Sequence, residues 1–220
     1  MMLGALFIFL VCCTTIPAHS RDGKNAAEIR RLVAFMEGQF TSLEHARDDS
    51  TIVPTLWYID RIWWDRTDGA WLLWRSYPYI RDSTPAPEPS EVCVIQIHEI
   101  EHGLIEQAFW DVRTPFIGST FDQDSSVVEQ LRTKDALSKR RGCEIIYQIG
   151  ADFYLGRTVG MACVPPKDMN AAALLATWRV RPMWIELLTQ GINSVGDVVA
   201  GRRGKPVFFM RTDDARAGRQ

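Results

Sequence analysis

Residues 142–163 read GCEIIYQIGADFYLGRTVGMAC and indicate a β-hairpin around which the rest of the chain is organised. Residues 150–152, Gly-Ala-Asp, have the composition of a turn. Gly156 in the second arm indicates a bulge, or a place where a neighbour packs close to the backbone. Period-two alternation before the turn is typical of a half-buried strand, because one face collects Cys143, Ile145, Tyr147 and Ile149.

The composition is that of an ordinary globular chain. With 220 residues, one domain is the default expectation. Hydrophobic residues make up 46%, charged residues make up 24%, and the formal net charge is −2. No basic stripe with interleaved aromatic residues is present, so nothing indicates a nucleic-acid partner. The chain has 8 tryptophans, which in such numbers fill a core or line a cavity.

The first 20 residues predict a signal peptide. An apolar run at Leu3–Val11 is followed by the small residues Ala18 and Ser20, which fits cleavage after Ser20. The run is too short to span a bilayer. Leu10–Cys13 loosely resembles a lipobox, so a lipid anchor is left open. We therefore expect an exported protein, periplasmic or secreted, with three parts: signal peptide 1–20, barrel domain 21–212 and disordered tail 213–220.

Cleavage would leave three cysteines. Because the count is odd, at least one of Cys93, Cys143 and Cys163 must be a free thiol. A disulfide between Cys143 and Cys163 would clip the hairpin and add about 3 kcal/mol by restricting the unfolded chain. The alternative is a pair of buried thiols on neighbouring strands. We expect the disulfide in an exported chain.

The remaining pattern predicts a closed antiparallel β-barrel of eight to ten strands, with room for one small ligand. A helix over Asn25–Met36 would close one end of this barrel. Residues 77–90 contain four prolines and form a long exposed loop. Other segments are expected as strands at 55–64, 70–77, 91–100, 104–112, 179–190 and 207–211, helix or loop at 123–138, and a helical turn or strand entry at 170–178.

His98–His102 spells H-E-x-x-H, the zinc pattern of a helical metallohydrolase. The preceding residues, Val92–Ile97, are rich in β-branched side chains and indicate a strand. On a strand, His98 and His102 would lie about 13 Å apart, too far for one zinc ion. We therefore expect no metal site here, and a zinc hydrolase is a distant alternative.

Aromatic and basic residues provide the candidate ligand site. Aromatic walls with a few cations suit a flat, conjugated ligand that carries carboxylates. The alternative is barrel core plus solvated arginines. Arg157 has the opposite strand parity to Tyr154, so both reach the interior only if Gly156 forms a bulge. The predicted ligand-binding residues are Trp74, Arg75, Tyr79, Arg81, Tyr154 and Arg157.

Three blocks of the sequence resemble the T-type phycobiliprotein chromophore lyases, the CpcT/CpeT family. Met36–Ala46 is similar to the family's opening segment, and Gly142-Cys143 with Gly156–Cys163 is similar to its centre. Gly191–Arg211 resembles its closing segment. Pro78–Arg81 keeps only a fragment of the family's P-Y-R-Q-R-V-Y stretch.

The resemblance implies a calycin-like antiparallel barrel that holds a bilin, a linear tetrapyrrole, and attaches it to a cysteine of a phycobiliprotein. It implies no cofactor other than a bilin or another tetrapyrrole as ligand. The implied partners are a hydrophobic small molecule and an acceptor protein, and a homodimer is compatible with the sequence. The alternative is an exported calycin-type binding protein without catalysis.

Overall fold

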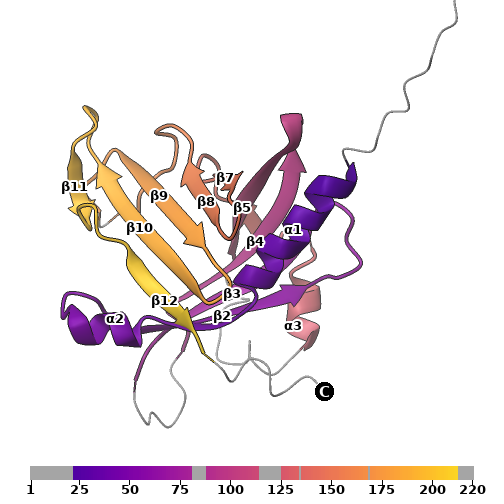
Figure 1. The fold of residues 1–220 in the computed structure, drawn as a ribbon, viewed down its shortest axis with the longest axis horizontal. Helices are drawn as coiled ribbons and strands as arrows, with labels where there is room; N and C mark the ends of the chain where they lie inside the picture. The colour runs from indigo at the N-terminus through magenta and orange to yellow at the C-terminus, as the bar shows by residue number, and fades with distance from the viewer. Residues whose placement is uncertain (1–21, 81–87, 114–124, 134, 168, 213–220) are drawn as a thin grey trace, which may run out of the picture.

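The computed structural model describes residues 22–80, 88–113, 125–133, 135–167 and 169–212 (Figure 1). None of the helices in these ranges is both long and apolar enough to cross a membrane. In chain order the elements are α1 (Asp22–Met36), β1 (Gly38–Thr41), α2 (Leu43–Asp48), β2 (Thr55–Ile62), β3 (Ala70–Pro78), β4 (Glu91–Ile100), the 3₁₀ helix η1 (Glu101–Gly103), β5 (Leu104–Val112), α3 (Ser125–Gln130), β6 (Leu137–Lys139), β7 (Ile145–Ile149), β8 (Tyr154–Thr158), β9 (Ala173–Val180), β10 (Trp184–Ile192), β11 (Val198–Gly201) and β12 (Val207–Arg211).

Ten antiparallel strands close into a barrel, as the sequence predicted. Their order around the ring is β10-β12-β1-β2-β3-β4-β5-β7-β8-β9, and the pairing of β9 with β10 closes it. The short strands β6 and β11 lie outside this ring, where β6 pairs with β5 and β11 pairs with β10. The calycin-like barrel with an N-terminal helix is confirmed.

Helix α1 closes one end of the barrel. It contacts β3, β4 and β9, and Figure 1 shows it crossing β3 and β4. Its apolar side chains Leu32, Val33 and Met36 are buried in the same cluster as the barrel's inner face. Arg31 donates hydrogen bonds to the carbonyl oxygens of Gly150 and Ala151. The helix therefore covers the end at which the turn between β7 and β8 lies.

Strand β3 is buried on both faces because it has two covers. Leu72 and Trp74 face the barrel interior. Trp71 and Leu73 face outward into a second apolar cluster that contains Leu131, just after α3. This double burial explains why β3 lacks the alternation expected of a strand with one wet face.

The β7–β8 hairpin is regular and has no bulge. Tyr147 lies opposite Gly156, and the register runs unbroken from Ile145–Thr158 to Ile149–Tyr154. A Cβ atom at Gly156 would lie 2.6 Å from Tyr147 Cε1. The glycine is therefore needed because the Tyr147 ring packs against the backbone.

Several elements differ from the sequence expectations. Strand β1 and helix α2 were not predicted, because a four-residue strand has too short a pattern and is defined by its long-range pairing with β2 and β12. For residues 170–178 a helical turn or a strand entry was expected, and the second holds, since β9 covers 173–180. Strand β2 ends at Ile62, since Trp63 adopts a positive φ of 48° and turns the chain.

Candidate functional site: a cavity at the open end of the barrel

The barrel contains a cavity of about 700 Å³ at the end opposite α1. It opens where β7 begins and β8 ends, so Cys143, Thr158 and Cys163 line it there. Residues 164–166 and Met169, between β8 and β9, form part of its wall. This volume lies within the range of roughly 300–1,000 Å³ that small-molecule sites occupy.

The inner part of the cavity is aromatic. Trp74, Phe109 and Trp178 line it, together with smaller apolar side chains such as Ala176. Behind them, Trp57 stacks at 26° on Trp178, with ring centroids 5.9 Å apart. Trp57 and Trp74 meet edge to face, with centroids 5.2 Å apart. The cavity therefore ends on rigid aromatic faces, which suit a flat conjugated ligand.

The rim of the cavity is charged. Arg140 donates from Nε to Asp111 Oδ1 at 2.6 Å and from Nη2 to Glu91 Oε1 at 3.0 Å. Burial lowers the pKa of Arg140, but the hydrogen bond to Asp111 and the negative charges of Glu91 and Asp111 together outweigh burial, so the pKa lies above its ordinary value. One fixed cation thus stands between two carboxylates at the mouth, offering both a donor group and acceptors to a ligand.

The free thiol in the described part of the chain is Cys93, on the inner face of β4. It lies opposite Trp74 and Asp111 in the neighbouring strands and is fully buried. Burial raises the pKa of this thiol well above its ordinary value. Cys93 therefore stays protonated and is a packing residue rather than a nucleophile.

Of the predicted ligand-binding residues, Trp74 lines the cavity. Arg75 points the other way, to the outer face, where it pairs with Asp60 at 2.5 Å. Tyr79 follows β3, is 37% exposed and does not line the cavity. Arg81 lies outside the described residues.

Tyr154 and Arg157 are not brought to the cavity. Tyr154 faces the interior but lies under α1, where its hydroxyl donates to Glu28 Oε2 at 2.6 Å. Arg157 is exposed on the outer face, because the regular register of β8 leaves no bulge to turn it inward. The residues that sequence reasoning missed are Glu91, Asp111 and Arg140. Strand parity carried a signal for Asp111, since it shares a face with Phe109.

The two histidines of the H-E-x-x-H pattern lie in different elements, one on a strand and the other in the turn that follows it. His98 lies on strand β4, with Nε2 3.6 Å from Glu106 Oε1. His102 lies in the following turn with a positive φ of 64°. Among the residues that the structure describes, no group of three or more His, Cys, Asp or Glu side chains is placed to hold a metal ion.

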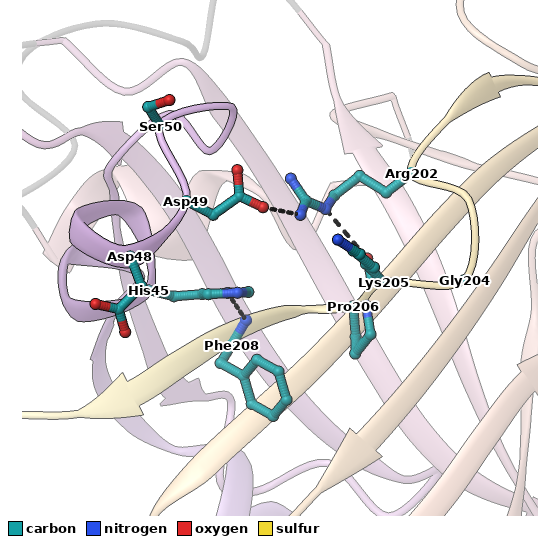
Figure 2. Close-up of a pocket in the computed structure, with 9 residues that line it drawn as sticks. All are labelled: His45, Asp48, Asp49, Ser50, Arg202, Gly204, Lys205, Pro206 and Phe208. Carbon is teal, nitrogen blue, oxygen red and sulfur yellow. Dashed lines mark hydrogen bonds and ion pairs between the residues drawn. The ribbon is translucent and has the colours of Figure 1, made fainter.

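A second hollow, of about 560 Å³, lies outside the barrel between α2 and β12 (Figure 2). His45 Nδ1 accepts a hydrogen bond from the backbone N–H of Phe208 at 3.0 Å. Arg202 donates to Asp49 Oδ2 at 2.5 Å and also to Thr51 and the Lys205 carbonyl. Since these groups are used in fastening α2 and the β11–β12 loop, we regard this hollow as structural.

The disulfide forms part of the cavity wall. Cys143 and Cys163 are joined by a disulfide bond across 20 residues, with their Cα atoms 4.4 Å apart. The bond ties the start of β7 to the segment after β8. The loop between β8 and β9 is therefore held against the mouth of the barrel.

No family model matches the chain, and no curated protein sequence matches it. Solved structures similar to it include the following two. The T-type phycobiliprotein lyase CpeT from Prochlorococcus phage P-HM1 aligns with a TM-score of 0.51 and 12% identity, over 84% of this chain and 97% of that one. The CRL protein of Arabidopsis aligns with a TM-score of 0.61 and 14% identity, over 86% and 99%. The CpcT/CpeT-like fold implied by the sequence resemblance is therefore confirmed.

Proposed function

We propose that this protein binds an open-chain tetrapyrrole, a bilin, in the cavity at the barrel mouth and presents it to a cysteine of an acceptor protein. The observation that carries the proposal is the cavity itself: about 700 Å³, ending on aromatic faces and rimmed by Arg140, Glu91 and Asp111. A bilin is flat and conjugated, with pyrrole N–H donors and carboxylate side chains. The carboxylates of the rim match the N–H groups, and Arg140 matches a carboxylate.

The transfer step rests on the resemblance to the T-type lyases. In that step the acceptor's thiol would add to the bound bilin, so the lyase holds the chromophore and needs no nucleophile of its own. Cys93, protonated and buried, agrees with this division of roles. The open mouth is the side from which an acceptor would approach.

A second candidate, an exported protein that binds the same ligand without transferring it, is favoured by the disulfide. Disulfides persist in oxidising compartments and are rare in the cytosol. The bond between Cys143 and Cys163 thus supports the proposal of export, periplasmic or secreted, with or without a lipid anchor.

Binding is tested by filling the cavity. Ala176 of β9 lines it, whereas the adjacent Thr177 has the opposite strand parity. In a titration of residues 21–220 with phycocyanobilin or biliverdin, followed by absorbance, we expect Ala176→Trp to abolish binding and Thr177→Trp to retain it. Equal affinity in both variants would place the ligand elsewhere. Failure of the unaltered protein to bind either bilin would refute the proposal.

Transfer is tested separately. The phycocyanobilin-loaded protein is mixed with a phycobiliprotein apo-subunit, and a denaturing gel is inspected for covalent bilin fluorescence. A fluorescent acceptor band that disappears after prior alkylation of the acceptor supports the lyase. Tight binding without such a band selects the binding protein.

A further inference from the structure

A residue that lines the cavity has a buried indole N–H without an acceptor among the described residues. Trp74 is 6% exposed and lines the cavity, yet its Nε1 has no hydrogen-bond partner in the described part of the chain. Native proteins pair the large majority of buried polar groups, because an unpaired donor has lost its water without a replacement. A donor left open beside a cavity points to an acceptor on the occupant.

Two aromatic rings pack against Trp74. Trp57 and Trp178 stand nearly perpendicular to it, at interplanar angles of 85° and 80°. Deeper on β5, two residues before Phe109 on the same face, Gln107 is fully buried, and its Nε2 also lacks a partner within the described ranges. Of these two open donors, the one on a residue that lines the cavity is Trp74 Nε1, while the carboxylates of Glu91 and Asp111 stand at the mouth.

We propose that the inner end of the cavity receives a carbonyl-bearing terminal ring of the ligand, with Trp74 Nε1–H donating to the carbonyl oxygen. The inference rests on the proposed bilin binding and narrows it. An open-chain tetrapyrrole carries a lactam carbonyl on each terminal ring, whereas the closed ring of a porphyrin has none. Trp74 then determines specificity for open-chain over closed tetrapyrroles.

The competing account is internal. An indole N–H can point at the face of a neighbouring ring, which is a weak hydrogen bond. If Trp74 donates to the face of Trp57 or Trp178, its N–H has no part in ligand choice. Trp74 then contributes only the area of its ring, which phenylalanine partly replaces.

Trp110 provides a matched control. It lies on the outer face of β5, and its Nε1 is likewise buried without a partner among the residues that the structure describes. The affinities of the unaltered protein, Trp74→Phe and Trp110→Phe are measured for biliverdin and for protoporphyrin IX. We expect Trp74→Phe to weaken biliverdin binding about tenfold, as loss of one hydrogen bond does. We expect Trp110→Phe to leave it unchanged, and neither variant to weaken protoporphyrin binding.

Each other outcome has a distinct meaning. If the unaltered protein binds biliverdin but Trp74→Phe binds it equally well, or loses both ligands alike, the inference is wrong and the proposed function stands. If the unaltered protein binds neither tetrapyrrole, both are wrong. If Trp74→Phe does not fold, ¹⁵N-tryptophan spectra of the unaltered protein decide. The Trp74 indole resonance, assigned through its contacts with Trp57 and Trp178, should move downfield with biliverdin, and no such movement overturns the inference.

Discussion

At the scale of single residues, Tyr154 fastens the first helix to the barrel. Its hydroxyl donates to Glu28 Oε2 at 2.6 Å and accepts from Arg31 Nε at 2.5 Å. Phe35 packs edge-on against the ring, with centroids 5.8 Å apart. Burial raises the pKa of Tyr154 to about 12, and the hydrogen bond to Glu28 adds to the effect. The protonated hydroxyl is therefore the form that holds α1 in place.

Tyr154→Phe should lower the free energy of unfolding at pH 7 by about 1–2 kcal/mol, since the hydrogen bonds of the hydroxyl with Glu28 and Arg31 are both lost. The unfolded tyrosine ionises near pH 10, whereas the folded one keeps its proton to about pH 12. The hydroxyl's contribution is thus complete below pH 10 and is lost as the pH rises toward 12. Urea denaturation of both proteins from pH 7 to 12 should show the difference shrinking over that interval. Tyr79→Phe, at an exposed site, is the control, and a pH-independent difference would contradict the account.

Strand parity predicted the face of a residue better than its depth in the barrel. Parity places Trp74 inside and separates Tyr154 from Arg157, as observed. It does not say which end of the barrel α1 covers, since that depends on contacts between residues more than 100 positions apart, such as Arg31 with Tyr154 (|i−j| = 123). Tyr154 was therefore expected at a ligand and is found under a helix.

At the scale of elements, the disulfide fixes the hairpin of β7 and β8. It closes a loop of 20 residues and lies in the cavity wall. Replacing Cys143 and Cys163 by serine should cost about 2–4 kcal/mol, because the unfolded chain regains the freedom of that loop. Adding reductant should lower the free energy of unfolding of the unaltered protein by the same amount. It should not change the free energy of unfolding of the double variant.

Thiol counting provides the control for this experiment. In residues 21–220, unfolding without reductant should expose one thiol to alkylation, Cys93, and unfolding with reductant should expose three. The native protein should not react, because Cys93 is fully buried. Alkylation of Cys143 and Cys163 in the unreduced protein would rule out the bond.

Long, strongly patterned elements could be predicted from the sequence, and short ones could not. The helix and the strands from β2 to β5 match their expected positions to within a few residues. Strand β1 has one fully buried side chain, Phe40, and exists because β2 and β12 flank it. The same limit applies to the cavity rim, where Arg140 comes from a loop and meets Glu91 and Asp111 only in the folded chain.

At the scale of the whole molecule, the last strand holds the first helix. Arg211, at the end of β12, donates to the carbonyl oxygens of Glu37 at 2.5 Å and Phe35 at 2.7 Å. Its Nε donates to the Pro182 carbonyl oxygen at 2.8 Å, next to β10. The carbonyls of Phe35 and Glu37 lie at the C-terminal end of α1, where the last carbonyls lack partners within the helix and carry its negative dipole end. The guanidinium of Arg211 thereby connects α1, β12 and the turn that precedes β10.

Arg211→Ala should therefore destabilise the whole barrel, by about 2–4 kcal/mol, because several charge-assisted hydrogen bonds to backbone carbonyls are lost at once. Its guanidinium also lies 4.7 Å from the centroid of the Phe40 ring, a contact that Arg211→Lys would keep only in part. We expect lysine to recover less than half of the loss. The control is Arg203, which donates an exposed hydrogen bond of 3.5 Å to the Val198 carbonyl; Arg203→Ala should change the free energy of unfolding by less than about 0.5 kcal/mol. Because α1 seals the inner end of the barrel, Arg211→Ala should also increase hydrogen exchange at the amides of β3, β4 and β9 beneath the helix. If these amides stay as protected as in the unaltered protein, the position of the helix does not depend on Arg211.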